Sequence, residues 1–364
     1  PYVTLNLSDL SLASNGGVTK ISGDLLLEER NLSIQSLELK KGNTQISDMQ
    51  ADFSLETMTG SASGNLLSYV TKKSITSPFK LEFNNSTVPE GKFFPDSFMV
   101  NLSLPAIKGA FIKKQFGLDL NIMYSQGNIN FYTSENAGIY GSISSDKFLE
   151  VNFDNNSFAK LKIFGSTGNK LDLNITDVDF DLEKAFGYFN FDTLFIVNGG
   201  KLTGFAGITG TSSEPDIKGN LGIIEPQLIF SLISPQKLQA AYTPITIENS
   251  EVRIEETIFS IKKTEKLLGW ATIFLNRFSF DHMEAKLKSI EDEKFPGKLK
   301  TKRFVIKSDV NIDLDLFYEN GIMDINGKII GENTSFSADV QKIASLNNAA
   351  PNDKRLNFRT DLDI

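Results

Sequence analysis

The chain has 364 residues, of which 40% are hydrophobic and 23% charged, with 29 Phe, a single His and no Cys. This apolar fraction supports extensive burial and excludes a disordered or low-complexity chain. Because the chain has no Cys and His282 is its one His, the sequence also excludes disulfide scaffolds, iron–sulfur clusters, thiolate zinc sites and His-rich metal centres. The formal net charge of −8 argues against broad nucleic-acid binding.

Neither end of the sequence resembles a natural chain end. The first residue is Pro1 rather than an initiator Met, and the strand-like segment 356–364 is cut while its alternation is still running. No run approaches the roughly 18 apolar residues of a membrane-spanning helix. We therefore expect an internal piece of a longer protein, whose anchor or targeting signal lies outside this chain.

Apolar and polar residues alternate along most of the chain, which is typical of strands with one apolar and one solvated face. Short turns separate these segments, at 42–43, 127–128, 168–169 and 320–321. The pattern predicts an all-β, antiparallel meander. The clearest alternating segments are 49–55, 79–83, 98–104, 116–122, 149–153, 171–175, 178–182, 271–275, 310–316 and 336–340.

Helical signal is scarce. The segments 182–191 and 226–234 are the best candidates for short helices, and 341–346 is a weaker one. Pro235 would end the second of these.

The number of strands limits the architecture. At about 12 residues per strand and turn the chain makes about 30 strands, whereas open twisted sheets rarely exceed about 10 without curling or splitting. A long curled sheet, a closed transmembrane barrel and a pair of sandwiches all fit the alternation. A barrel favours Tyr and Trp at its interfaces, but the chain has 29 Phe against 8 Tyr and 1 Trp. We expect an all-β fold: a long, curled, mainly antiparallel sheet forming an elongated groove, with a few short helices.

One segment is more specific than the alternation. Residues 199–223 read GGKLTGFAGITGTSSEPDIKGNLGI. This resembles the TamB family of AsmA-like proteins, in which a glycine-rich strand pair leads to a G-T-x-x-x-P-x-[IV]-x-G-x-L step. A looser resemblance runs from residue 178 to the end, so we divide the chain into 1–177 and 178–364, two parts of one continuous structure. The motif positions are Gly200, Gly204, Gly207, Gly210, Thr211, Pro215, Ile217, Gly219 and Leu221.

The resemblance implies a bridge-like lipid transport protein. Members of the family are anchored in the inner membrane of Gram-negative (diderm) bacteria by an N-terminal segment, which is absent here, and cross the periplasm as a β-groove. Their terminal domain, for which this chain has no match, meets TamA or a BamA-like outer-membrane assembly protein. The implied function is non-enzymatic phospholipid transport towards the outer membrane, supporting outer-membrane biogenesis and protein assembly or secretion.

The alternation favours the same function independently. A sheet with one apolar face must cover that face or aggregate, and acyl chains are suitable cover because each CH₂ removed from water contributes about 0.8 kcal/mol. The alternatives are ordinary sandwich core, a structural surface protein such as an adhesin or passenger domain, and an outer-membrane β-barrel. The residues that we predict to line a lipid groove are Phe116, Leu118, Leu120, Ile122, Phe131, Val151, Phe153, Ile163, Leu173, Ile312, Leu314 and Leu316.

The remaining candidates for chemistry are weak. No Gly-x-Ser-x-Gly elbow supplies a nucleophile for His282, which we interpret as a surface or turn residue. Asp313 and Asp315 alternate with apolar residues and belong to a solvated strand face. The Gly-rich segment 199–211 has no Gly-Lys-Ser/Thr, so it is not a phosphate loop. We expect no catalytic residue, metal, cofactor or nucleic-acid partner.

A basic run near residue 300 has two interpretations. It could meet phospholipid headgroups, but we favour an edge strand whose lysines discourage pairing between sheets. The run comprises Lys298, Lys300, Lys302 and Arg303.

Overall fold

A computed structural model describes most of the chain. The described residues are 2–14, 17–70, 73–87, 96–109, 112–133, 138–155, 158–188, 195–211, 214–230, 234–276, 279–291, 293–300, 304–319, 322–338 and 357–363. Hydrogen bonding assigns 24 strands to one sheet, and among the described pairs only β23–β24 is parallel. The prediction of an all-β, mainly antiparallel sheet is confirmed. The sheet has fewer strands than the predicted 30 or so because single strands reach 17 residues.

Internal contacts divide the chain into two compact units. Unit 1 comprises residues 1–169 and 187–190, and unit 2 comprises residues 170–186 and 191–364. This division at 169–170 differs from the division at 177–178 predicted from the looser sequence resemblance. Each unit is described by itself below.

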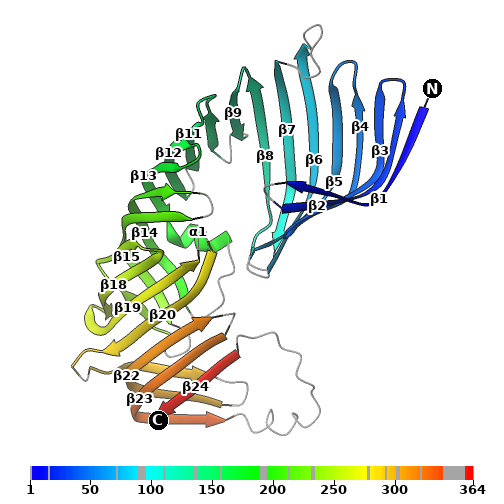
Figure 1. The fold of residues 1–364 in the computed structure, drawn as a ribbon. Helices are drawn as coiled ribbons and strands as arrows, with labels where there is room; N and C mark the ends of the chain where they lie inside the picture. Colours follow the sequence, from blue (N-terminus) through cyan, green and yellow to red (C-terminus); the bar gives the residue numbers. More distant parts are fainter. Residues whose placement is uncertain are drawn as a thin grey trace. The chain divides into compact units, whose positions relative to one another are not determined.

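Unit 1 is a meander in which each strand pairs with the next, from β1 to β12, always antiparallel. Figure 1 shows its long strands side by side. The strands are β1 (Tyr2–Ser14), β2 (Gly17–Glu28), β3 (Asn31–Lys41), β4 (Thr44–Ser54), β5 (Thr59–Val70), β6 (Lys73–Thr87), β7 (Ser97–Gly109), β8 (Phe116–Ser125), β9 (Asn128–Thr133), β10 (Ile139–Ile143), β11 (Phe148–Asn155) and β12 (Ala159–Thr167).

Unit 2 is also built mainly of antiparallel strands, and it contains two further short strands, β16 and β21. β16 pairs with β15 and β18, and β21 pairs with β22. The elements are β13 (Leu171–Asp181), α1 (Leu182–Tyr188), β14 (Phe195–Gly210), β15 (Pro215–Phe230), β16 (Lys237–Gln239), β17 (Tyr242–Glu248), β18 (Glu251–Ile261), β19 (Thr264–Asn276), β20 (Ser279–Ser289), β21 (Phe295–Lys300), β22 (Phe304–Glu319), β23 (Ile322–Ala338) and β24 (Asn357–Asp363).

The short elements test the local predictions. Helix α1 forms at its predicted start, where the Asp181 carboxylate accepts a hydrogen bond of 3.0 Å from the backbone N–H of Lys184, as an N-cap does. The helix predicted over 226–234 is wrong for 226–230, which end strand β15. There Leu228 and Gln227 pair with both β14 and β16, so sheet pairing overrides local preference. The segment 341–346 lies outside the described residues. The turn at 42–43 is confirmed, and the one predicted at 127–128 lies one residue earlier, at 126–127, with Gly42 and Gly127 at positive φ. The turn predicted at 320–321 lies outside the described residues.

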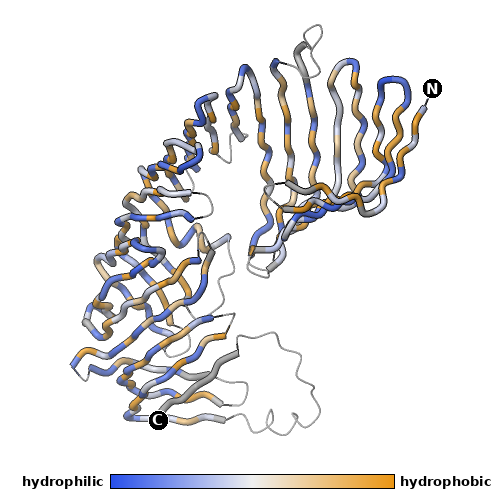
Figure 2. The backbone as a smooth tube through the Cα atoms, in the orientation of Figure 1, coloured by the Kyte–Doolittle hydropathy of each residue, from blue (hydrophilic) through white to orange (hydrophobic). Residues whose placement is uncertain are grey.

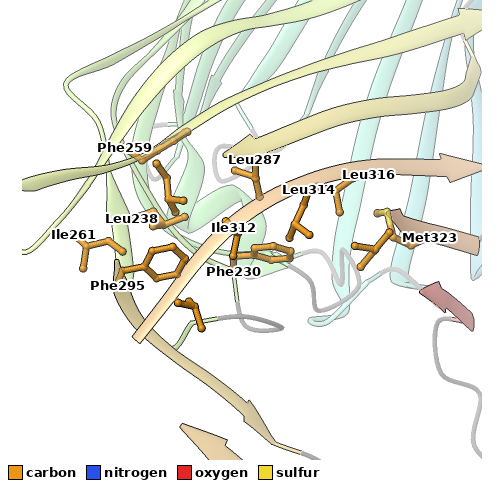
Figure 3. Packing of buried hydrophobic residues seen from close by; sticks show 13 residues of the cluster. Phe230, Leu238, Phe259, Ile261, Leu287, Phe295, Ile312, Leu314, Leu316 and Met323 are labelled. Atoms are coloured by element: carbon orange, nitrogen blue, oxygen red, sulfur yellow. The ribbon is translucent and has the colours of Figure 1, made fainter. Parts of the chain in front are cut away.

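The two units differ in how their apolar residues are covered. Unit 2 contains a packed core (Figure 3), whereas unit 1 has only three buried hydrophobic side chains among its described residues, Leu37, Ala62 and Ala159. The core of unit 2 consists of Phe230, Leu238, Phe259, Ile261, Leu267, Leu287, Phe295, Val310, Ile312, Leu314, Leu316, Met323 and Ile325.

Candidate functional site

One face of unit 1 is apolar across all twelve strands. Residues directly opposite one another on neighbouring strands point to the same face, so the pairing register can be followed from strand to strand. Hydropathy alternates along each strand accordingly (Figure 2). The first row across this face is Val3, Leu27, Leu32, Phe53, Gly60, Phe83, Val100, Ile122, Phe131, Gly141, Val151 and Ile163.

A second apolar row lies beside the first, two residues further along each strand. It consists of Leu5, Leu25, Ile34, Ala51, Ala62, Leu81, Leu102 and Leu120, and it ends at Thr133. We call the surface formed by these two rows, and by the residues that alternate in phase with them, the apolar face.

The opposite face of the same strands is polar. The row one residue away contains Thr4, Leu26, Ser33, Asp52, Ser61, Glu82, Asn101, Asn121, Tyr132, Tyr140, Asn152 and Lys162. Its side chains interact with one another, as in the 2.7 Å hydrogen bond from the Ser33 hydroxyl to the Asp52 carboxylate. The Lys80 ammonium lies 2.6 Å from the Glu82 carboxylate, and its hydrogen bond and charge hold the pKa of Glu82 below its usual range. These polar side chains are suited to contact with water, although the Oδ1 atom of Asn101 in the same row is buried without a hydrogen-bond partner.

Rings pack along the apolar face, and glycines make room for them. Phe53 and Phe83 flank Gly60, with ring centroids 5.6 Å apart. A Cβ added to Gly60 would lie 2.7 Å from the Phe53 ring, and one added to Gly141 would lie 2.7 Å from the ring of Phe131. The two glycines of the first row are therefore sites where a neighbouring ring lies over the backbone, so the row remains apolar there.

The protein itself only partly covers this face. Its inner side chains, such as Phe83, Val100 and Ile122, are half-buried. At the edge strand β1, Val3 and Leu5 are 51% and 54% exposed. An apolar surface of this extent is unusual for a soluble monomer and marks an interaction surface.

Most of the residues predicted to line a groove lie on the apolar face. Eight of the twelve belong to unit 1: Ile122, Phe131, Val151 and Ile163 in the first row, Leu120 in the second, and Phe116, Leu118 and Phe153 in phase with them. The prediction omitted the residues contributed by β1 to β7, although the same alternation marks them in the sequence.

The other four predicted lining residues lie in unit 2. Leu173 faces Ile208 on β14 and is half-buried. On β22, Ile312, Leu314 and Leu316 are 1%, 0% and 3% exposed and belong to the packed core. Protein side chains cover these three, because Phe230, Leu238 and Phe295 of neighbouring elements pack into the same cluster (Figure 3). They are core residues and do not line an open surface.

The glycine motif forms the β14–β15 hairpin. Gly210 pairs with Pro215, and the turn between them is closed by reciprocal hydrogen bonds between the backbones of Thr211 and Glu214, 3.1 and 3.2 Å long. Within the hairpin Ala206 faces Gly219, and Ile217 faces Ile208. In the described residues the motif positions belong to this hairpin, and strand β15, rather than the helix of a phosphate loop, follows the turn.

Two glycines of the motif should respond oppositely to substitution. Gly204 has φ of +133°, and an added Cβ would overlap the Asn220 carbonyl oxygen, so we expect Gly204→Ala to destabilise the fold by about 1–3 kcal/mol. Gly207 has open space, with the nearest atom 3.7 Å from an added Cβ. Gly207→Ala should leave stability unchanged or raise it by about 0.4–1 kcal/mol. Urea denaturation of both variants measures the difference, and equal midpoints would contradict it.

The remaining polar candidates have structural partners. His282 lies within strand β20, where its ring stacks on Phe274 at 4.2 Å and its Nδ1 is 2.9 Å from the Asp281 carboxylate. Lys286 contacts Asp315 at 2.9 Å and Asp313 at 3.1 Å, and these hydrogen bonds raise the pKa of Lys286. The two carboxylates thus belong to a charged outer face.

The basic run is only partly described. Lys298 and Lys300 lie in β21, which among the described residues pairs with β22 alone, whereas residues 301–303 lie outside the description.

Among the described residues, no group of side chains has the composition of a metal site, and no helix has the length and hydropathy needed to cross a membrane. No protein-family model matches this chain, and no curated protein matches it.

Proposed function

We propose that this chain is a non-enzymatic lipid transport protein and that the apolar face of unit 1 binds phospholipid acyl chains. The observation that carries the proposal is one apolar row across β1 to β12 and a second across β1 to β8, in a unit whose described residues bury only three hydrophobic side chains. An apolar face of this kind must be shielded from water, and the described side chains of unit 1 shield it only partly.

Acyl chains fit this face better than a small ligand does. At about 4.8 Å per strand, the first row across twelve strands is roughly 50 Å long and the second, across eight strands, is roughly 35 Å long. The residues of these rows are Leu, Ile, Val, Phe, Ala and Gly, with no charged residue. Each CH₂ removed from water contributes about 0.8 kcal/mol wherever it lies along such a row. Because one position resembles the next, a bound chain can move along the row without crossing a large barrier.

The same proposal includes the family, the cellular location and the partner of this protein. The glycine motif of β14 and β15 supports kinship with the TamB family, and with it a periplasmic location in a Gram-negative bacterium and transport from the inner to the outer membrane. An outer-membrane assembly protein such as TamA or a BamA-like protein would be the partner, reached through a part of the protein outside this chain. Outer-membrane biogenesis would be the process served.

Mass spectrometry of bound lipid is the direct test. The chain would be expressed in a bacterial periplasm and purified without detergent, and its organic extract analysed. We expect several phospholipids per chain, because two rows of this length accommodate more than one pair of acyl chains. A matched extract from an all-β protein without an exposed apolar face serves as the control.

A lipid-free, monodisperse chain would contradict the proposal. The apolar face would then be covered by protein, and a structural surface protein, such as an adhesin or passenger domain, would be the better interpretation. The packed core of unit 2 is what such a protein would also contain.

A further inference from the structure

The two ends of the strands in unit 1 carry opposite charge. Because β1 to β8 are antiparallel and pair in sequence, alternate turns gather at the same end of the strands. One end consists of the turns after β1, β3, β5 and β7, and it is the lower end of the blue and cyan strands in Figure 1. The other end consists of the turns after β2, β4, β6 and β8.

The described residues at the first end carry only basic charge. Within the segments 12–20, 39–45, 67–76 and 106–116 they include seven Lys and no Asp or Glu. We call this the basic end. The described residues of the opposite, acidic end, within the segments 26–33, 53–59, 84–97 and 123–128, include four Asp or Glu and one Arg.

The described lysines of the basic end lack partners of opposite charge. Lys20 and Lys40 lie directly opposite each other on β2 and β3, in phase with the polar face, which is unfavourable for two like charges, whereas Lys41, opposite Thr19, is in phase with the apolar face. Lys41 follows on the same strand, and Lys113 and Lys114 lie in the turn between β7 and β8. All five are exposed, and none forms an ion pair within the described residues. At the acidic end, by contrast, the Arg30 guanidinium lies 3.8 Å from the Glu56 carboxylate.

The apolar face extends from the basic end by about the length of an acyl chain. On β2, the residues in phase from Ile21 to Leu27 face Leu39 to Leu32 on β3. Six residue steps along a strand span roughly 20 Å, and the hydrocarbon of one bilayer leaflet is about 15 Å thick. A phospholipid with its headgroup at the basic end can therefore place its acyl chains entirely on the apolar face.

We propose that the basic end of unit 1 selects anionic phospholipids and orients them, with the headgroup at the turns after β3 and β7 and the acyl chains along the strands. This inference rests on the proposed function and adds to it the class of lipid and its direction. Charge complementarity supports this occupant, because unneutralised lysines beside an apolar surface match an amphiphile with a negative headgroup. Such lysines attract anionic headgroups over about 10 Å at moderate ionic strength.

The test uses the full chain and vesicles of equal parts phosphatidylglycerol and phosphatidylethanolamine. After incubation and removal of the vesicles, bound lipid is extracted and the ratio of the two lipids is measured. We expect the wild-type chain to be enriched in phosphatidylglycerol. The variant with Lys41→Gln, Lys113→Gln and Lys114→Gln should retain lipid but lose the enrichment, by about fivefold for each lysine that lies beside a headgroup.

A matched variant with Glu28→Gln, Glu29→Gln and Glu56→Gln at the acidic end should keep the wild-type enrichment. All six positions are exposed, so circular dichroism should show both variants folded. If the wild-type chain binds both lipids without preference, or if the lysine variant keeps the preference, this inference is overturned while the proposed function stands. If the wild-type chain binds no lipid at all, both fail.

Discussion

Replacing Ile122 and Phe131 together by Asp should reduce phospholipid transfer by roughly tenfold. The two residues face each other across β8 and β9 in the first apolar row. Two carboxylates there require an acyl chain to pass charged, hydrated groups. The loss of contact with two CH₂ groups alone corresponds to about 1.6 kcal/mol, and 1.4 kcal/mol is a factor of ten. Transfer of a fluorescent phospholipid from donor to acceptor vesicles measures the effect.

The matched control lies one residue away on the same two strands. Asn121 and Tyr132 face each other on the polar face, so Asn121→Asp with Tyr132→Asp introduces the same charges on the side that we propose carries no lipid. We expect its transfer rate to remain near that of the wild-type chain. Equal rates for both folded double variants would show that the apolar face does not carry lipid.

Ile312→Ala should destabilise unit 2 by about 2–5 kcal/mol, the usual cost of truncating a fully buried aliphatic side chain. Ile312 is 1% exposed and contacts the core in which Leu314 is wholly buried. The control is the same substitution on β23, Ile330→Ala, because Ile330 is 55% exposed and should cost no more than about 0.5 kcal/mol. Denaturant titration with delipidated protein gives both values.

The comparison of these two variants also distinguishes a core residue from a residue that lines a lipid-binding surface. A residue that only contacts lipid contributes little to the stability of delipidated protein, whereas a core residue contributes fully. If Ile312→Ala and Ile330→Ala are equally mild in delipidated protein, the packing of β22 is looser than the structure indicates, and Ile312 would return to the set of candidate lining residues.

The sequence by itself determined the class of fold and the side of each strand that is apolar. Strict alternation, as at Phe116, Leu118 and Leu120, produces two unlike faces regardless of which strands are neighbours, because successive side chains in a strand point to opposite sides. The turn of the hairpin at Gly210 and Pro215 is also marked in the sequence, because turn residues favour a turn through their own backbone conformation.

Only the tertiary structure decided which apolar faces the protein covers. Leu120 and Leu314 belong to equivalent alternating patterns. However, Leu120 lies on the half-buried face of unit 1, whereas Leu314 is fully buried in the core of unit 2. That difference depends on Phe230, Leu238 and Phe295, which come from distant segments of the chain. Local pattern carries no information about such contacts.

The register between strands could not be predicted from the sequence either. It aligns Leu27, Phe83 and Ile122 into one row, and it brings Lys20 opposite Lys40 at one end of the strands. A shift of one residue in any pair would move the apolar side chains of a strand to the other face. The alternation therefore determines that an apolar face exists, while long-range pairing determines its continuity, its cover and the charge at its ends.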